Sequence, residues 1–474
     1  MGIQEPDFNL KTKMDDHALE QVPENERKSW IQLSNNTMGI CSTILIMLFG
    51  ALATFTAGLW FGLLAGIISL ILGTIFGSLL GNIAQREGLS STVLTRYYGF
   101  GIKGSVVSSL VFCFMILGML ALENALLYHG VLFFFKLKPS IPNAILIYGI
   151  FTLCWILLSL FGIKIVYRMA SIAIFGFLIV LVYILVNAIF FGDNSVGDFL
   201  SFGPQFSAKV GTSEFIAAIN ILIGATGALT LVTADSSRYA RTKKDVILTS
   251  LFGNLMQNIV ILLAGGIVAY VGIGYVVEYY MTNDGMTSAQ AHAIAFDDMA
   301  SFFIILGGIV GFILMFLANG KAQVLNTYSG SLALTNLFAA IGWKGNRAIF
   351  VVLANIVALI MIYFNILSLV ESWLDALGVL TTSMATIIIV DFYFVKKRIP
   401  LNNNEKSIET INIAGILTLI LSSILSLYLS YAKIFPIPVL ASIVLSIILY
   451  PLLRLFIFKR KSVMNQITDQ DINS

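Results

Sequence analysis

Four ionisable side chains lie inside long apolar runs, and each has a possible chemical use. Glu123 lies in LGMLALENALLYHG, Lys321 in FLANGKAQVLNTYSG, and Glu371 and Asp375 in SLVESWLDALG. A charge at the centre of a membrane helix costs about 2.5–3.5 kcal/mol, so such residues usually face a protein interior and have a function. A carboxyl can accept and release a proton, and an ammonium can act as a fixed cation or pair with a carboxylate.

Each of these charges also has a plainer interpretation. Lys321 can extend its ammonium toward one end of a long helix. Glu123 and Lys321 can form a purely structural pair. Glu371 and Asp375, four residues apart on one helix face, can line an aqueous vestibule. The sequence leaves these alternatives open.

Catalytic and metal-binding patterns are absent from the sequence. It contains no HExxH or GxSxG motif, and its three histidines lie far apart. Its three cysteines lie in apolar runs, at spacings that fit neither a zinc site nor a disulfide framework. These residues are His17, His129 and His292, and Cys41, Cys113 and Cys154. We therefore expect no enzyme, no metal site and no cofactor.

The composition identifies the medium in which these residues lie. The 474 residues are 58% hydrophobic and 11% charged, with a mean hydropathy of +0.91. Soluble domains carry about 45–50% apolar and about 25% charged residues, and disordered chains are richer still in charge. The chain is therefore expected to be a polytopic protein of the lipid bilayer. A net charge of +3 gives no support for nucleic-acid binding.

Twelve apolar segments are long enough to cross a hydrocarbon core as helices, which takes about 20 residues. The runs are continuously apolar, which favours helices over the alternating strands of a barrel. The predicted spans are 31–55, 59–83, 104–134, 140–162, 168–191, 213–234, 246–272, 302–334, 347–364, 366–394, 411–431 and 435–457. Residues 1–30 and 459–474 are polar ends, and 273–298 is predicted as an outside loop with some helical character.

The basic residues predict the orientation, because they gather in cytoplasmic loops. With the N-terminus inside, the inside segments hold 23 of the 28 basic residues and the outside segments hold four, while Lys321 falls within a helix. Both termini are therefore expected in the cytoplasm, with the protein in the cell membrane. The N-terminal segment lacks the apolar core of a cleaved signal peptide.

Two clusters of small and polar residues indicate broken helices. If spans one to five and six to ten form repeats, about 31–191 and 213–394, then 34–43 and 224–230 lie in matching helices. Inverted-repeat transporters place their sites at such breaks, where unwound backbone faces a ligand. The alternative is close packing, because small residues also line membrane helix interfaces.

Four stretches carry a resemblance to the nucleobase:cation symporter-1 family, which includes the cytosine and purine permeases. The stretches are DHALEQVP with ERKSW at 16–30, GLSS with GFGIKG at 88–104, TADSSRYAR at 233–241, and DFY followed by KKR at 391–398. The resemblance implies an all-α, five-plus-five inverted-repeat fold of the leucine-transporter type, with two extra helices. It also implies alternating access to a planar heterocycle.

The resemblance also implies substrate-binding positions. Aromatic residues on helices three and six sandwich the ring in characterised members, and the matching positions here carry Met119 and Thr226. Glu123, one turn after Met119, is expected to bond the ring edge, and Asn326 is a further candidate on helix eight. Gly224 and Gln323 complete the predicted substrate site.

The expected ion site departs from sodium-coupled members, which use carbonyls on helix one and hydroxyls on helix eight. The matching positions here are Gly39 on helix one and Lys321 and Ala322 on helix eight. An ammonium cannot ligate sodium but can take its place. The resemblance therefore favours proton coupling through Glu123, or a fixed cation, over sodium coupling.

The expected function is import of a nucleobase or a related small heterocycle. A small amine or amino acid is the rival substrate, which the missing aromatics and Glu123 favour, and a non-transporting membrane sensor is the second alternative. The expected partners are a small molecule and the lipid bilayer, without nucleic acid or a protein partner.

Overall fold

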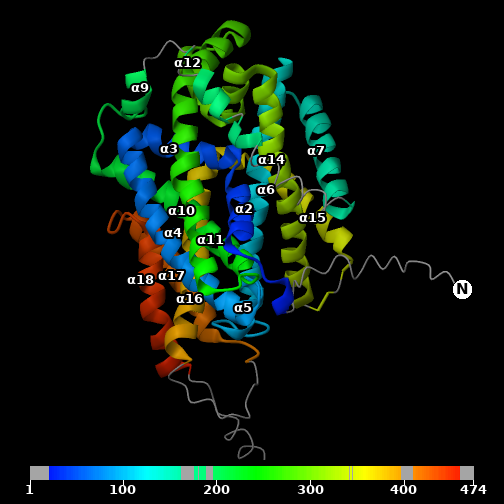
Figure 1. The fold of residues 1–474 in the computed structure, drawn as a ribbon, viewed down its shortest axis with the longest axis vertical. Helices are drawn as coiled ribbons and strands as arrows, with labels where there is room; N and C mark the ends of the chain where they lie inside the picture. The colour runs from blue at the N-terminus through cyan, green and yellow to red at the C-terminus, as the bar shows by residue number, and fades with distance from the viewer. Residues whose placement is uncertain are drawn as a thin grey trace, which may run out of the picture.

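The computed structural model describes residues 21–161, 176–179, 181–187, 190, 196–340, 342–343, 345–396 and 409–458. Its helices run mostly along the long axis of one bundle (Figure 1). The α-helices are α2 (Trp30–Cys41), α3 (Ile44–Ala57), α4 (Leu59–Glu87), α5 (Ser91–Tyr97), α6 (Ser105–Phe135), α7 (Ile141–Phe161), α9 (Val196–Ser201), α10 (Thr212–Ser237), α11 (Lys243–Leu255), α12 (Leu262–Asp284), α13 (Ser288–Asp297), α14 (Met299–Ala340), α15 (Arg347–Tyr363), α16 (Val370–Val390), α17 (Ile413–Tyr431) and α18 (Pro438–Leu452).

Shorter turns adjoin several of these helices. They are the 3-10 turns η1 (Glu24–Glu26) and η3 (Ile366–Leu369) and the π-helical turns η2 (Met256–Ile261), η4 (Asp391–Val395) and η5 (Leu453–Ile457).

Within the described residues, nine helices are long and apolar enough to span a membrane, or ten when α2 and α3 count as one bent span. They follow the predicted segments, and α15 is a shorter apolar helix at the ninth. The predicted fifth span, 168–191, lies largely outside the described residues.

Three local predictions need correction. The predicted break at 224–230 is wrong in the structure, because α10 is continuous through it. The predicted loop 273–298 is wrong over its first half, since α12 continues to Asp284, and α13 follows. The eighth span begins at Met299 and is kinked at Gly308, whose φ of 55° is open to glycine at little cost.

Close helix crossings explain the small residues of α10. Gly224 packs against the backbone of α16, where an added Cβ would lie 2.6 Å from the Leu374 carbonyl oxygen. An added Cβ at Gly378 of α16 would lie 2.7 Å from the Gly224 Cα. The alternative interpretation, close packing through small residues, therefore describes this cluster.

The interior is built around α6 and α10. The long helix α14 packs along α6, α10 lies between α4 and α16, and α3 packs on α12. Figure 1 shows α17 and α18 beside α16, so the two C-terminal helices extend the bundle on one side. Buried hydroxyls join them: Ser383 of α16 lies 2.6 Å from Ser422 and 2.8 Å from Ser446.

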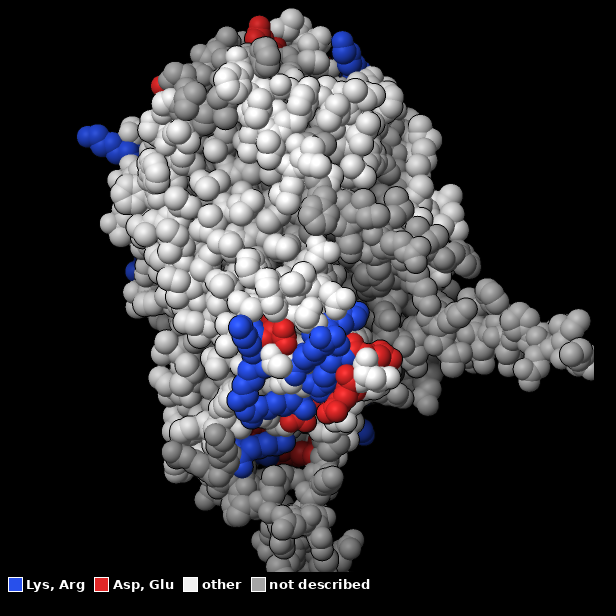
Figure 2. Space-filling view, in the orientation of Figure 1, with Lys and Arg blue, Asp and Glu red and all other residues white. Residues whose placement is uncertain are grey.

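Lysine and arginine gather at one end of the bundle, which we call the basic end (Figure 2). The pre-helix segment before α2 is held there. Lys28 and Ala240 form an isolated β-bridge, and the Trp30 ring stacks on Phe252 of α11 at 5.2 Å. The N-terminal segment is therefore attached to the loop between α10 and α11.

Candidate functional site

The first span bends at the predicted cluster of polar residues. Helix α2 ends at Cys41, α3 begins at Ile44, and the two axes differ by 68°. Thr43 is the N-cap of α3 and accepts from the Ile46 N–H. Asn319 of α14 accepts from the Ile44 N–H at 2.9 Å, so a side chain from another helix satisfies backbone freed at the bend.

Lys321 reaches this bend and not the membrane surface. Its side chain is only 7% exposed, and Nζ donates to Ser42 Oγ at 2.9 Å. The Ser42 hydroxyl lies 2.9 Å and 3.1 Å from the carbonyl oxygens of Met38 and Gly39, to which it donates. One hydroxyl thus accepts from the ammonium and donates to helix α2. The Gly39 carbonyl, a predicted ion ligand, is one of those acceptors.

Glu123 faces the same region from α6. It is 3% exposed, and its Oε2 accepts from Asn326 Nδ2 at 3.2 Å. The Thr43 side chain interacts with the same carboxyl group. Lys321 attracts this carboxylate electrostatically, but no direct ion pair joins the two described side chains. Ser42 contacts Lys321, and the next residue, Thr43, contacts Glu123. The bend therefore links the two ionisable side chains.

Several polar atoms beside this network have no hydrogen-bond partner among the described residues. On α14 they are Asn319 Nδ2, Gln323 Oε1 and Thr327 Oγ1, spaced four residues apart and hence on one helix face. Gln323 uses its other amide atom, Nε2, to donate to the Leu120 carbonyl of α6. Buried polar atoms are nearly always bonded, so a row of unbonded ones can receive a ligand.

Sequence reasoning missed Trp373 of α16. Its ring packs against Gly118 of α6, where an added Cβ would meet the indole, and its Nε1 has no partner among the described residues. Gly118 lies five residues before Glu123, about 7.5 Å along the helix. The sequence signal for this ring is Gly118 on α6, and a glycine at that position is equally compatible with ordinary helix packing.

The structure separates some predicted site residues from Glu123. Thr226 bonds the Asn258 amide at 3.2 Å, and it faces Gly73 of α4. Met119 is half-buried in the apolar core, and Ala322 is buried. Glu123, Lys321, Gln323 and Asn326 thus come together, whereas Gly224 and Thr226 face other helices.

A second polar cluster contains Thr226. Gln257 and Asn258 lie on the π-helical turn η2, and both bond the Thr226 hydroxyl. Gln257 also lies 3.8 Å from the thiol of Cys41, the residue before Ser42. The bend in the first span is therefore flanked by a charged cluster on one side and an amide cluster on the other.

Two predicted acidic residues lie on α16. Glu371 is exposed and Asp375 is partly exposed, so their predicted role at a vestibule stays a prediction.

His129 is partly exposed and lines a pocket of about 110 Å³ with Tyr148 and Asn365. In the described part of the chain, no group of three or more His, Cys, Asp or Glu residues is placed to hold a metal ion.

A family comparison places the chain. The family model described as "Permease for cytosine/purines, uracil, thiamine, allantoin" matches residues 21–445. The chain belongs to this permease family. It is therefore a membrane transporter and not an enzyme. A search of curated protein sequences found no matching relative.

Solved structures share the fold of this permease at low sequence identity. The inward-facing conformation of Mhp1 superposes with a TM-score of 0.70 at 17% identity, covering 91% of this chain and 92% of Mhp1. A second structure is that of Mhp1, a nucleobase-cation-symport-1 family transporter, in a closed conformation with bromovinylhydantoin bound. It superposes with a TM-score of 0.67 at 17% identity, covering 94% of this chain and 97% of Mhp1. A Na+-coupled sialic acid symporter in a substrate-bound outward-open state superposes with a TM-score of 0.61 at 13% identity, covering 93% of this chain and 92% of the symporter.

Proposed function

We propose that this permease imports a nucleobase or related small heterocycle across the cell membrane, coupled to protons and not to sodium. In this proposal the chain has twelve spans, with a five-plus-five inverted repeat and both termini in the cytoplasm. The observation that carries the coupling is the ammonium of Lys321, bonded at 2.9 Å to Ser42 at the helix bend.

The ammonium supports this choice through its chemistry. Lys321 and Ala322 match positions where sodium-coupled relatives offer hydroxyls, and neither side chain can donate an oxygen ligand. Glu123 supplies the exchangeable proton in this proposal, because it is a buried carboxyl on a neighbouring helix. Glu123 interacts with Thr43 at the bend and with Asn326 of α14, so its protonation changes a contact at each of these two places.

We assign substrate recognition to unbonded polar side chains of α14 and α16, two helices that both pack on α6. The unbonded atoms of Asn319, Gln323 and Thr327 offer donors and acceptors to the edge of a heterocycle, as base edges require. The indole of Trp373 offers an aromatic face and an N–H that has no partner in the described part of the chain. These groups support a planar, hydrogen-bonding ligand in place of the ring sandwich expected at Met119 and Thr226.

Uptake into proteoliposomes tests both parts of the proposal. We expect accumulation of labelled cytosine, a purine, uracil or allantoin to follow an imposed pH gradient and to ignore a sodium gradient. Glu123→Gln should abolish pH-driven uptake. Glu278→Gln, an exposed carboxylate on α12, is the matched control and should leave uptake unchanged.

Three outcomes contradict parts of the proposal. Uptake that needs sodium and is indifferent to pH rejects proton coupling. Transport of amines or amino acids, without transport of heterocycles, rejects the substrate class and favours the rival transporter. Saturable binding without accumulation favours the membrane sensor.

A further inference from the structure

Helix α5 lies at the basic end of the bundle (Figure 1), and carboxylates from two different spans hold its two ends. The backbone N–H of Ser91, the first residue of α5, donates to Asp235 Oδ1 of α10 at 2.6 Å. The N–H of Gly99, which follows α5, donates to Asp391 Oδ2 of η4 at 2.8 Å. The short helix is therefore bonded to the end of α10 on one side and to the end of α16 on the other.

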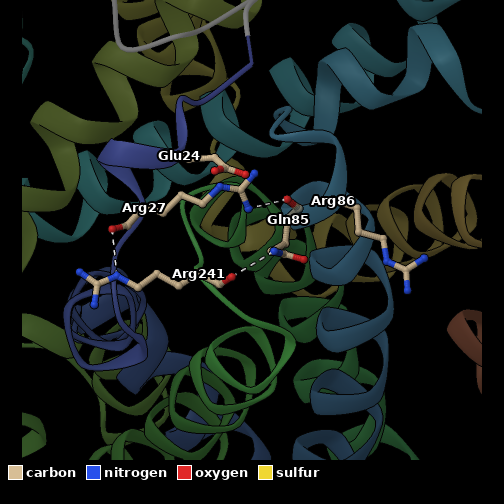
Figure 3. Close-up of a pocket in the computed structure, with 5 residues that line it drawn as sticks. All are labelled: Glu24, Arg27, Gln85, Arg86 and Arg241. Atoms are coloured by element: carbon tan, nitrogen blue, oxygen red, sulfur yellow. Dashed lines mark hydrogen bonds between the residues drawn. The ribbon is translucent and has the colours of Figure 1, made fainter.

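The end of α4, which leads into α5, is fastened to the end of α10. Arg27 Nη1 donates to the carbonyl oxygens of Gln85 of α4 at 2.9 Å and of Ala240 at 3.1 Å. Arg241 Nε donates to the Arg27 carbonyl at 3.2 Å, and Gln85 Nε2 donates to the Arg241 carbonyl at 3.4 Å (Figure 3). These bonds join the pre-helix segment, the end of α4 and the loop between α10 and α11 into one assembly.

The turn η4 holds the other end of α5 through side chains as well. The Tyr98 ring packs edge-on against Phe392 at 5.2 Å between ring centres, and Lys396 Nζ lies 4.0 Å from the centre of the Tyr98 ring. Asp391 is only 5% exposed, and the Tyr450 side chain of α18 interacts with the same carboxyl group. The end of α5 is therefore fixed to the end of α16, which is fixed in turn to α18.

Turns at glycine flank α5 on both sides. Gly88 before it has a φ of 65° and Gly99 after it a φ of 89°, which are left-handed conformations that glycine adopts at little cost. A helix of seven residues is marginal by itself, so its contacts set its direction. Along its length, the Thr95 hydroxyl lies 2.7 Å from that of Ser108 of α6. The two carboxylate bonds therefore fix the ends of a segment that also packs on α6, the helix that carries Glu123.

We propose that Asp235 and Asp391 are positioning residues of the transport cycle, which hold α5 as a link between the ends of α10 and α16. A movement of α10 at the basic end is then passed through α5 to η4 and to the start of α6. Both carboxylates lie at the basic end with α5, whereas Glu123 is about 27 Å along α6 from Ser105, the first residue of that helix. They are therefore expected to affect the movement and not substrate binding. This role rests on membership of a transporter family and is independent of the substrate and the coupling ion.

Spin-label distances in the full chain test what each carboxylate holds. Labels at Tyr97→Cys of α5 and Lys244→Cys of α11 report the end near α10, and labels at Tyr97→Cys and Phe394→Cys report the end near η4. The three native side chains are exposed. The background is Cys154→Ser, because Cys154 is exposed and the other two cysteines are buried. Double electron–electron resonance should give one narrow distance for each pair when both carboxylates are present.

Variants at each end should loosen only that end. Asp235→Asn should broaden the distance distribution of the first pair, and Asp391→Asn that of the second. Ser91→Pro breaks the first bond from the opposite side, because proline has no backbone N–H. Proline suits the first position of a helix, and Ser90 before it is already extended, with φ −67° and ψ 158°. Ser91→Pro should therefore reproduce the result of Asp235→Asn, even if one of the two variants folds poorly.

Uptake kinetics in proteoliposomes separate a positioning role from a purely structural one. Asp235→Asn and Asp391→Asn should each lower the maximal rate about tenfold, as expected for a weakened charge-assisted bond, while the KM for labelled cytosine, a purine, uracil or allantoin changes less than about twofold. A link fails when either end is released, so the double variant should be no slower than the slower single variant. Independent contacts would instead multiply to about a hundredfold loss.

Asp245→Asn is the matched control. Its carboxylate also accepts a backbone N–H at the basic end, from Trp30 at 2.9 Å, but Trp30 belongs to α2 and not to α5. It should leave both distance distributions narrow, and its effect on the rate should multiply with that of Asp391→Asn. The proposal is overturned if the distributions of Asp235→Asn and Asp391→Asn stay narrow, if they broaden without a loss of rate, or if the two losses multiply. Absence of uptake by the native protein contradicts the proposed substrates instead, and the distances still decide whether the link exists.

Discussion

Replacing Lys321 with methionine tests whether the two interior charges act as one unit. Methionine keeps an unbranched apolar stem but removes the ammonium, which leaves Glu123 buried at 3% exposure without its countercharge. Ser42 keeps its donor bonds to the carbonyls of Met38 and Gly39, so helix α2 loses little directly. The loss of folding stability is therefore expected to come mainly from the buried Glu123 carboxylate.

The size of the effect follows from the geometry. The two groups interact through space without a direct ion pair, so their separation exceeds contact distance. At an effective dielectric constant of about 20, two unit charges about 4 Å apart attract each other by about 4 kcal/mol, and the attraction falls with distance, so we take about 2 kcal/mol for this more distant pair. Removing one partner of a buried pair in direct contact costs about 3–5 kcal/mol. We therefore expect Lys321→Met to lower the free energy of unfolding by about 3 kcal/mol.

A double-mutant cycle isolates this interaction. Unfolding free energies are measured in detergent for the native protein, Lys321→Met, Glu123→Gln and the double variant. The double variant should be about 2 kcal/mol more stable than the sum of the single effects predicts. A control cycle of Lys321→Met with Glu278→Gln should be additive within about 0.5 kcal/mol. Additivity in the Glu123 cycle itself would refute the coupling.

Three further predictions concern the scaffold. Gly378→Ala should lower the thermal unfolding temperature by an amount equivalent to about 1–3 kcal/mol, because its Cβ would meet α10, whereas Gly274→Ala has open space and should be neutral or mildly stabilising. Arg454→Gln breaks the 2.6 Å bridge to Glu409 and should cost about 1–3 kcal/mol in chemical unfolding, with Glu409→Gln giving a similar loss. Thr43→Ala removes the N-cap of α3 and should cost about 1 kcal/mol in the same assay, and an unchanged midpoint would contradict the cap.

The sequence predicted the spans well because lipid leaves a strong signal. Continuous apolar runs located α4, α6 and α10 to within a few residues at most boundaries. The end of α12 was missed because residues 273–284 contain acidic and polar side chains, yet their backbone still forms helix to Asp284. Apolarity marks the lipid-facing length of a helix and not its full length.

The two clusters of small residues had opposite outcomes for a physical reason. At 34–43 the chain contains Ser42 and Thr43, whose hydroxyls can replace backbone partners at a bend, and Asn319 caps the start of α3. At 224–230 the Thr226 hydroxyl is engaged by Gln257 and Asn258, and the glycines admit the backbone of α16. The two clusters look alike in one sequence, because the difference depends on what another helix brings.

The sequence identified Glu123 and Lys321 as candidate functional residues, but it did not predict that both contact the bend in the first span. Their cost in lipid singled out Glu123 and Lys321, and the structure places them around one bend. Of the unbonded row on α14, the sequence prediction named only Gln323, because polar residues four apart are equally compatible with hydrogen bonds to a neighbouring helix.

Three consecutive residues at the bend make contacts with three different helical elements. Cys41 contacts Gln257 of η2, Ser42 accepts from Lys321 of α14, and Thr43 interacts with Glu123 of α6. A change in the angle between α2 and α3 must therefore alter all three contacts together. Conversely, neutralising Glu123 weakens one of the contacts that hold this angle. The bend is thus the place where a protonation step on α6 can be converted into a movement of the first span.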